Sequence, residues 1–575
     1  MEDDKVSKKA KEIISRFESL KTDRAQFEEV WRECEFAISP ISQNWQDEKP
    51  KDKYKIPPRE TSQPTSYMNT CCTGIAGYAA SANIKWFQLS LMSDELNEAD
   101  GVPQWLSKCE RIMRRTFERC GLYKRLTHWI ELSCIYGHSA MLIEEVSNAD
   151  APIRYHVPEA QEVYFDNNDI GETEVVYRYY WSDVENIVNR YGKKAMHKKI
   201  VEQYDKWLEQ KEDGKNTTPL DMKILHAVQL RRNGKPEYGE TVANKKWASY
   251  IVDVENKHII KESGYDDFPY ALFFWQHTGK PYGISPTIMG LNDIKMYQQA
   301  YNGLLRCMQK IADPTYTVPM SGKRQWNFAP GAINEVTSME QAPQPTSAGA
   351  EFAQFITVMS SLESHVKDWY NVDFFIMLRQ QQGLANMTAT AIGALQGEQV
   401  ALLAALVSNL FEGLNKIVQR TFDILAKKKL LPPLPFALQQ MGGSLKVDFV
   451  GVLAQAQKMA YEYSNIQAAL GIAGQYNEFG KVDPRFSRVI NWIKEDKLFK
   501  MTLDSLGISP EVLRTEEEYN KLMAGIDEKE AAQAAQQAAA QENQALLQNF
   551  KNLGKKPEQG SPAENWLSPL GLQNR

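Results

Sequence analysis

The sequence predicts an α+β protein with several domains, and three observations support that class. The chain has 575 residues, more than one compact core usually holds, with 43% apolar and 24% charged residues, as in folded soluble proteins. Short runs that alternate apolar and polar residues lie in the first half of the chain and indicate strands. Long runs with apolar residues at steps of three and four dominate the second half and indicate helices.

The chain is predicted to begin with helices. Apolar spacing predicts a helix over 6–37, and small residues dominate 67–82, as in a tightly packed helix. A loop rich in proline, serine and charged residues separates them. The stretch "WFQLSLM" is typical of a strand. The sequence that follows it predicts two more helices, which break near Gly121.

Two stretches of alternating sequence predict the strands of a small sheet. One covers 139–178 and the other 223–274, and turn-forming residues divide each of them. Between them, "SDVENIVNRYG" predicts a short helix, and the side chains of Ser182 and Asp183 can accept hydrogen bonds from its first amides. The first half of the chain is therefore expected to be α+β.

Two long amphipathic helices are predicted in the second half, with a small module between them. One runs from Thr287 to Ile311 and is stopped by Pro314, and the other runs from Glu351 to Asn371. The sequence between them is rich in Gly, Pro and β-forming residues, which predicts a small strand-and-turn module. The side chains expected to pack these helices are Leu291, Ile294, Leu305, Met359, Leu362 and Val366.

A polar, uncharged stretch interrupts the helical sequence directly after the second of these helices. Apart from one arginine it carries only amides, glycine and small residues, so it offers no acid, base or nucleophile for catalysis. A third long helix is predicted from Ala394 to Lys428, followed by the strand "SLKVDFVG", further helices and an Ala/Gln-rich segment. The notable residues of the polar stretch are Arg379, Gln380, Gln381, Gln382, Gly383 and Asn386.

Charge and cysteine usage restrict the classes of function. The formal net charge of −6 argues against a surface that is basic throughout and grips nucleic acid, but it leaves local contacts open. Seven scattered cysteines and an N-terminus without an apolar signal sequence predict reduced thiols in a cytoplasmic setting. The apolar run after Gly397 is interrupted by charged and amide side chains, so no membrane span is expected.

No motif for catalysis, metal binding or cofactor binding is found in the sequence. "HTGKPYGIS" contains Gly279 and Lys280 of a phosphate loop, but it lacks the upstream glycine and has Pro281 where Ser or Thr would bind magnesium. The eight histidines form no ligand pattern, and the adjacent Cys71 and Cys72 suit buried positions better than one metal ion. No enzyme, cofactor or metal is therefore predicted.

The order of these elements resembles the portal, or head-to-tail connecting, proteins of short-tailed phages. The resemblance extends from about Phe17 to Gln457 and includes "RAQFEEVWRECEFAISP", "ANIKWFQLSL" and the block "WLSKCERIMRRTFERCGLYKRLTHWIELSCIYGHSAMLIEE". The most specific stretch is "YGISPTIMGLNDIKMYQQAYNGLLRCMQKIADPTYTVP". "PGAINEV", "MTATAIG" and "FVGVLAQAQK" follow in the order of the family. The Ala/Gln-rich C-terminus departs from the simple family pattern.

The resemblance implies the phage portal fold, assembled as a ring of twelve subunits around a DNA channel at one capsid vertex. Such a ring serves DNA packaging and ejection. The implied parts are an α+β wing (1–280, with a long helix and strand at 392–452), a first stem helix (281–311), a small α/β clip (312–346), a second stem helix (347–376), a tunnel loop (377–391), a crown (453–525) and a C-terminal helical barrel with a mobile tail (526–575).

The resemblance also implies partners and a location. The partners are double-stranded DNA in the channel, the terminase large subunit, the tail adaptor, the major capsid and scaffolding proteins and, as a further candidate, internal core proteins. The protein would belong to the virion, at its unique vertex, after assembly in the host cytoplasm and without a membrane. Two other functions stay open from the residues alone: a nucleic-acid-processing motor subunit and an oligomeric scaffold unrelated to DNA.

The polar stretch fits the role of a tunnel loop that faces DNA. Lysine and arginine bind phosphates strongly because each contact releases counterions, whereas amides offer weak, interchangeable hydrogen bonds. Gly383 permits the backbone to bend, and Arg379 adds one charged contact per subunit. The alternative is an ordinary surface loop between two helices.

Three residues of the predicted clip are candidates for an interface. Lys323, Arg324 and Trp326 would contact a neighbouring subunit, the motor or DNA, since arginine and tryptophan are common anchors of interfaces. The alternative is a solvated turn in which Trp326 fills a small core.

Overall fold

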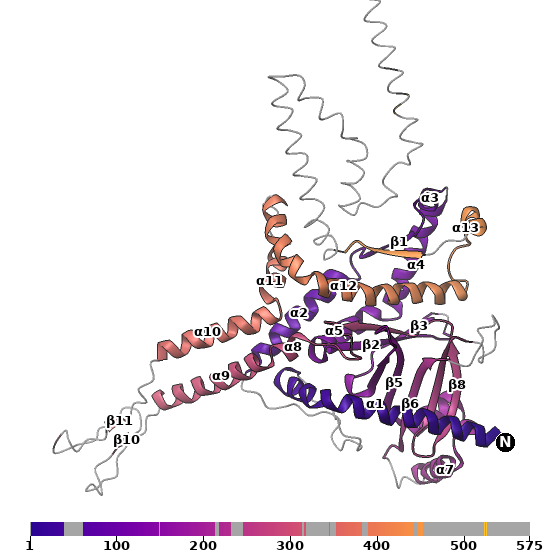
Figure 1. Cartoon of the computed structure of the whole chain (residues 1–575), viewed down its shortest axis with the longest axis horizontal. Coiled ribbons are helices and arrows are strands. Elements are labelled where there is room, and N and C mark those ends of the chain that lie inside the picture. Colours follow the sequence, from indigo (N-terminus) through magenta and orange to yellow (C-terminus); the bar gives the residue numbers. More distant parts are fainter. Residues whose placement is uncertain are drawn as a thin grey trace, which may run out of the picture. The chain divides into compact units, whose positions relative to one another are not determined.

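The architecture below is that of the computed structural model of the chain (Figure 1), and it rests on the residues whose structure the model describes. They are residues 2–39, 61–99, 101–148, 150–212, 218–231, 245–312, 316–317, 338, 344–345, 352–381, 389–441, 445–451, 523, 525 and 529. The chain divides into two units, 1–507 and 508–575. All the helices and strands below belong to the first unit. Nearly all of the predicted crown and C-terminal barrel lies outside the described residues.

The first half of the chain is α+β, as predicted, and its helices form where apolar residues recur every three or four positions. Helix α2 begins at Gln63 rather than at 67, because Pro64 is well accommodated in a first helical turn. The break near Gly121 is confirmed, since this glycine has a φ of 72°. The long helices are α1 (Glu2–Ile38), α2 (Gln63–Ala79), α4 (Val102–Arg119) and α5 (Leu122–Tyr136).

A five-stranded antiparallel sheet follows the order β4-β5-β6-β7-β8. Its strands are β4 (Val163–Asn167), β5 (Thr173–Asp183), β6 (Asp221–Leu230), β7 (Trp247–Asp253) and β8 (His258–Tyr265). Alternate residues point to opposite faces: Leu225 packs with α1, whereas Ile224 packs with the helices on the other side. The two covering helices on that second side are α6 (Val184–Tyr191) and α7 (Lys198–Glu212).

Two features of this region differ from the sequence-based predictions. The side chain of Asp183 caps α6 by accepting from the backbone N–H of Glu185 at 3.0 Å, whereas Ser182 belongs to strand β5. Helix α7 was not predicted. It buries Ile200, Tyr204 and Trp207 at spacings of four and three residues against the sheet.

A second, three-stranded antiparallel sheet has the order β3-β2-β9 and packs against α5 and α12 (Ala389–Lys427). Its strands are β2 (His138–Glu145), β3 (Ile153–His156) and β9 (Tyr270–Phe274). A Cβ atom at Gly413 of α12 would lie 2.6 Å from the ring of Trp129 and 2.8 Å from the carbonyl oxygen of Leu272. Only glycine lets the helix approach the sheet this closely.

The strand predicted at "WFQLSLM" and the one predicted at "SLKVDFVG" pair with each other. They are β1 (Phe87–Leu91) and β12 (Leu445–Phe449), and their antiparallel register places Phe87 opposite Phe449. The ring of Phe449 stacks on that of Phe411 in α12, with centroids 4.3 Å apart. This pairing joins two segments that are far apart in the sequence. The remaining short segments are α3 (Asp94–Glu98), η1 (Ala160–Glu162), η2 (Lys193–Ala195) and α13 (Phe436–Met441).

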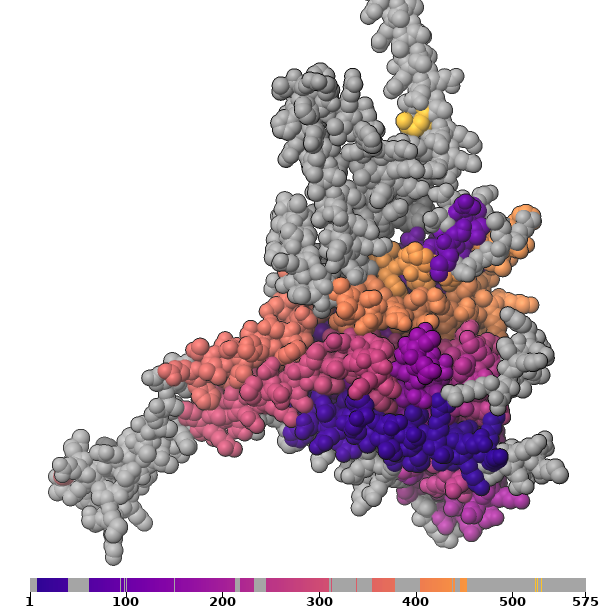
Figure 2. Space-filling model, in the orientation of Figure 1, coloured from indigo at the N-terminus to yellow at the C-terminus, as the bar shows by residue number. Residues whose placement is uncertain are grey.

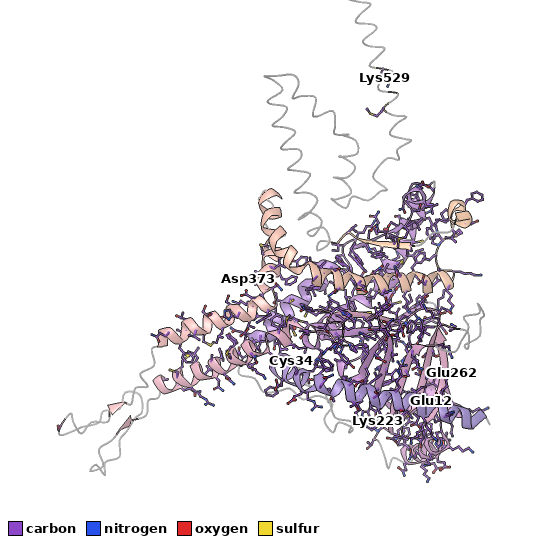
Figure 3. The ribbon with its side chains drawn as sticks, in the orientation of Figure 1. Glu12, Cys34, Lys223, Glu262, Asp373 and Lys529 are labelled. Carbon is purple, nitrogen blue, oxygen red and sulfur yellow. The ribbon has the colours of Figure 1, made fainter. Side chains whose placement is uncertain are left out.

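Helix α1 is tied to the five-stranded sheet by buried aromatic contacts and by charge. Phe17 packs edge-on against Tyr164 of β4, with ring centroids 4.9 Å apart. Glu262 of β8 lies beside α1 (Figure 3), and its carboxylate forms an ion pair with Lys9 at 3.2 Å. Among the described helices, none is both long and apolar enough to cross a membrane.

We expect the stability of this region to depend on pH through His128. Glu131 and Glu159 raise the pKa of this histidine from 6.5 to about 9, with Nε2 3.2 Å from the Glu159 carboxylate. Because the folded pKa is raised, the stabilisation is complete below pH 6.5 and is lost as the pH rises through about 9. The wild type is expected to exceed His128→Gln in urea midpoint at pH 6, and the difference should disappear by about pH 10. A difference that stays constant over this range would contradict the ion pairs.

Candidate functional site: the α9–α10 helix pair

The two long amphipathic helices predicted in the second half lie side by side and run away from the sheets (Figures 1 and 2). The first is divided at Gly290 into α8 (Pro286–Met289) and α9 (Leu291–Ala312). The second is α10 (Phe352–Trp369), which is followed by α11 (Val372–Gln381). Asn371, at the junction, has a φ of 49°, a conformation that asparagine tolerates better than most residues. Hereafter, "helix pair" denotes α9 and α10.

The base of the helix pair is fixed to the end of α5 by buried hydroxyl groups. Ser285 accepts from the backbone N–H of Ile288 at 2.9 Å and donates to the carbonyl of Ile135 at 2.8 Å. Thr287 donates to the carbonyl of Cys134 at 2.8 Å and bonds the hydroxyl of Tyr370 at 2.9 Å. Carbonyls in the last turn of a helix have no partner within the helix, so these hydroxyls satisfy α5 while they orient α8.

The side chains predicted to pack the two long helices differ in how deeply they are buried within a single chain. Leu291, Ile294, Met359 and Val366 are buried, Leu362 is half-buried, and Leu305 is 38% exposed. The indole N–H of Trp369 donates to the carboxylate of Asp293 at 2.7 Å and so ties the base of α10 to α9. The role of Leu305 in packing the two helices stays a prediction.

Polar contacts tie the helix pair to α1 and α2. Lys295 forms an ion pair with Glu33 at 2.8 Å, and the hydroxyl of Tyr67 donates to the carboxylate of Glu363 at 2.7 Å. Lys367, 2.6 Å from the same carboxylate, and Tyr67 lower the pKa of Glu363. The direction of the pair relative to the body of the protein is thus held by both apolar and charged groups.

The segment between the helix pair begins and ends in a short antiparallel ladder. Strands β10 (Tyr316–Thr317) and β11 (Gln344–Pro345) pair with each other, in agreement with the predicted strand-and-turn module. The interface candidates Lys323, Arg324 and Trp326 lie outside the described residues.

The loop predicted at 377–391 is shorter than expected at both ends, and the prediction for 382–388 stays untested because those residues lie outside the described ones. Helix α11 extends through Gln381, so Arg379, Gln380 and Gln381 are helical, and α12 begins at Ala389 rather than at 394. Arginine, glutamine and alanine all favour helix by propensity, which outweighs the polar character that suggested a loop. Gln382, Gly383 and Asn386 lie outside the described residues.

Apolar side chains remain exposed on α8 and the helix pair. Of the thirteen large hydrophobic side chains exposed in the described residues, six lie on these helices: Met289, Met296, Leu305, Met308, Ile356 and Val358. At 100° per residue, Ile356 and Val358 point about 160° apart and so flank α10 on two sides. These six residues form what we call the apolar flanks. Such a concentration on a protruding element makes these helices a candidate for a protein–protein contact.

The chemistry available in the described part of the chain is not that of a metal centre. No group of three or more His, Cys, Asp or Glu side chains is placed there to hold a metal ion. All seven cysteines are free, and Cys71, Cys72 and Cys134 are buried together between α2 and α5.

Comparison with known proteins places the chain in a family. The family model "Bacteriophage head to tail connecting protein" matches residues 10–513, and the chain therefore belongs to the family of bacteriophage head to tail connecting proteins. Two similar proteins are named as portal proteins. The portal protein of Salmonella phage epsilon15 is 23% identical over 557 residues, which is 94% of each chain. The probable portal protein of Bordetella phage BPP-1 is 23% identical over 512 residues, which is 87% of this chain and 88% of its own.

The close contact at Gly290 gives a test of the geometry at the base of the pair. A Cβ atom there would lie 2.6 Å from the Trp369 ring, so Gly290→Ala is expected to displace the indole and break its hydrogen bond to Asp293. We expect a loss of about 1–3 kcal/mol in the free energy of unfolding. Gly77→Ala, within α2 and with nothing inside 4 Å, is the control and should be neutral or slightly stabilising. Equal stability of the two variants in urea would contradict this packing.

Proposed function

We propose that the protein is the portal subunit of a phage, twelve copies of which form a ring at one capsid vertex. The ring is the channel through which DNA is packaged and ejected. The observation that carries this proposal is the helix pair, whose base is locked to the core while its apolar flanks remain exposed. Membership of the head to tail connecting family supports the same function.

A ring explains why the apolar flanks lie on more than one side of the helix pair. A cyclic ring needs two different surfaces on each subunit, because each copy contacts one neighbour on either side. Ile356 and Val358, 49% and 56% exposed, occupy two sides of α10. Contact with two neighbours would remove both from water, whereas a two-fold dimer would use one shared surface only.

The parts of the chain take their roles from this arrangement. Residues 1–280 and 392–452 form the wing, 281–311 and 347–376 the stem around the channel, and 312–346 the clip, where Lys323, Arg324 and Trp326 contact a neighbour, the motor or DNA. Residues 377–391, within which α11 ends and α12 begins, form the tunnel segment. Residues 453–525 form the crown and 526–575 the C-terminal barrel and tail.

The partners follow from a place at the junction of head and tail. The clip meets the terminase large subunit during packaging and the tail adaptor afterwards, and the wing meets the major capsid and scaffolding proteins and, inside the head, internal core proteins. The protein is assembled in the host cytoplasm and becomes part of the virion. Guiding DNA through a channel requires side chains of suitable position and charge, but it requires no catalytic residue or cofactor.

Size-exclusion chromatography followed by negative-stain imaging of the purified chain tests this proposal. A ring with a central hole of duplex width is the expected result. A monomer that hydrolyses nucleotides would instead favour a motor subunit, and a closed assembly without a bore would favour a scaffold unrelated to DNA.

The tunnel segment is tested by changing its amides. Replacing Gln380, Gln381 and Gln382 together by alanine is expected to leave folding and ring assembly intact but to impair packaging or retention of DNA. Replacing the same three by lysine should slow translocation, because each phosphate contact then releases counterions and binds strongly. Gln203→Ala, on the exposed face of α7, is the control. Normal genome filling in the alanine variant would exclude this role.

A further inference from the structure

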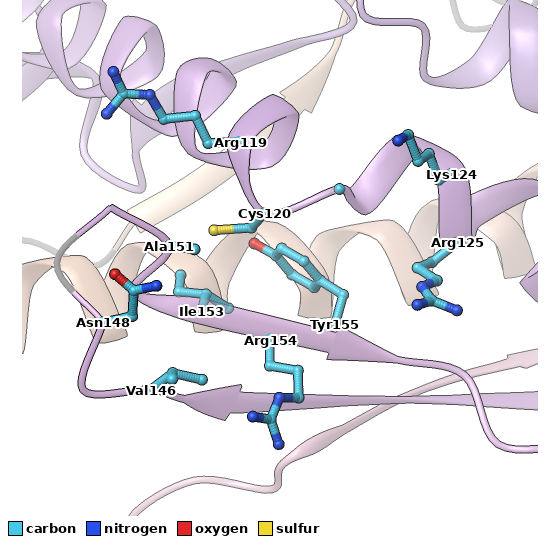
Figure 4. A pocket seen from close by; sticks show the side chains of 11 residues that line it. Arg119, Cys120, Lys124, Arg125, Val146, Asn148, Ala151, Ile153, Arg154 and Tyr155 are labelled. Atoms are coloured by element: carbon cyan, nitrogen blue, oxygen red, sulfur yellow. The ribbon is translucent and has the colours of Figure 1, made fainter.

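A cavity of about 580 Å³ lies between the α4–α5 turn and strand β3, and basic side chains surround it (Figure 4). Arg119 ends α4, Lys124 and Arg125 lie in the first turns of α5, and Arg154 lies on β3. None of the described residues that line the cavity is acidic. In a chain whose net charge is −6, this is a local concentration of positive charge.

Most of these cations are available to a ligand. Arg119, Lys124 and Arg125 are exposed, and within the described residues no ion pair joins them to a carboxylate. Arg154 lies 3.9 Å from Glu144, but Arg190 is closer to that carboxylate, at 3.3 Å. The positive charge at the cavity is therefore only partly neutralised.

The basic surface continues along α4. A second hollow of about 220 Å³ is lined by Arg111, Arg114 and Arg115, together with one acid, Glu118. Arg111, Arg115 and Arg119 recur every four residues, so they share one face over roughly 12 Å of helix. One face of α4 thus carries arginines of both hollows, and we call the two together the α4–α5 basic surface.

The N-terminus of α5 adds a second feature that favours anions at the same place. Gly121, which lines the cavity, precedes this 15-residue helix with a φ of 72°, and no side chain caps it. The first turn of α5 contains no acidic residue. The free amides and the positive end of the helix dipole therefore favour an anion beside the four cations.

We propose that the α4–α5 basic surface binds the phosphate backbone of duplex DNA, at a site separate from the helix pair. Arginine, lysine and helix N-termini are the groups that most often contact DNA phosphates. The aromatic residue in the cavity, Tyr155, is buried and its hydroxyl bonds Thr421 at 2.8 Å, so the cavity offers no ring for stacking bases. Tyr123 in the second hollow is half-buried, and its hydroxyl accepts from the indole N–H of Trp86 at 3.2 Å. The site reads the backbone rather than the sequence.

The inference rests on the proposed function in one respect, since DNA is taken as the source of phosphate because a portal ring encounters it. The experiment separates the two by using covalently closed circular duplex DNA. A closed circle cannot be threaded through a preformed ring, so its binding reports only the outer surfaces. The full-length protein is first imaged. A wild type that forms no ring counts against the proposed function. The comparison of circular-DNA binding then decides by itself whether the α4–α5 basic surface binds DNA.

The variant is Arg119→Ala with Arg125→Ala, and the control is Lys198→Ala with Lys199→Ala, which removes the same charge from the start of α7. We expect affinity for circular DNA to fall about tenfold or more in the arginine variant. The slope of log affinity against log salt should become shallower by about 0.9 for each phosphate that is no longer neutralised. The control should bind as the wild type does.

Two results would overturn the proposal. One is equal affinity and equal salt slope in the arginine and lysine variants. The other is a competition experiment in which polyglutamate displaces the circular DNA from the wild type, but linear duplex DNA at equal charge concentration does not. That result would assign the surface to an acidic protein segment. Circular dichroism spectra identical to the wild type verify that each variant is folded.

Discussion

Replacing Ile356 and Val358 together by aspartate is expected to abolish the ring while leaving each protomer folded. Both side chains are about half exposed in the single chain, so aspartate costs little there. In the proposed ring each would become a buried, unpaired carboxylate, which costs several kcal/mol per site. Because every interface of a closed ring carries the same change, the penalties add around the ring and assembly should fail.

Light scattering coupled to size-exclusion chromatography measures the effect. Ile170→Asp provides the matched control, because Ile170 is 84% exposed in the turn between β4 and β5, away from α10. The control should elute as rings, and the double variant as protomers with an unchanged circular dichroism spectrum. Rings of normal size in the double variant would show that the flanks of α10 are not in the interface.

Elements with a strong local pattern are those that the sequence predicted well. Apolar residues at steps of three and four identify α1, α9 and α10, because one face of each helix is buried. Helix α7 has the same spacing in Ile200, Tyr204 and Trp207, but charged residues between them mask it. The pairing of β1 with β12 depends on tertiary structure and has no local signal.

The breaks between helices were harder to predict than the helices. Apolar periodicity continues through Gly290, so the sequence predicts one helix where the structure has α8 and α9. At 377–391 the polar residues predicted a loop, whereas Gln381 ends one helix and Ala389 begins the next. Helix propensity and polarity pointed in opposite directions here, and periodicity could not decide between them.

The basic cavity illustrates what sequence alone cannot reach. Arg119, Lys124 and Arg125 are close along the chain, and their clustering is visible in the sequence. Arg154 joins them only because β3 packs on the α4–α5 turn. The absence of acids from the described lining is likewise a product of the fold, since Glu118 is adjacent to Arg119 in the sequence but does not line the cavity.

Arg24→Met is expected to cause the largest loss of stability among the variants proposed for the α+β half of the chain. This arginine is 3% exposed and donates from Nη1 to the carbonyls of Gln161 and Val163 at 2.8 and 2.9 Å. It also donates to Glu28 at 2.7 Å and lies over the ring of Tyr164. Methionine keeps the apolar stem but leaves the two carbonyls without this donor and Glu28 with the exposed Arg32 alone, at an expected cost of about 3–5 kcal/mol.

Arg32→Met is the matched control, because Arg32 belongs to the same helix and pairs with the same carboxylate of Glu28 at 3.2 Å, but is 52% exposed. Its loss should cost no more than about 1 kcal/mol, since solvent screens an exposed pair. Urea unfolding is best measured in the aspartate double variant of α10, where dissociation of a ring does not contribute to the transition. If both methionine variants lost the same stability, the charge on Glu28 alone would explain the effect. A larger loss for Arg24→Met would show that the buried bonds to β4 and its preceding turn fix α1 on the sheet.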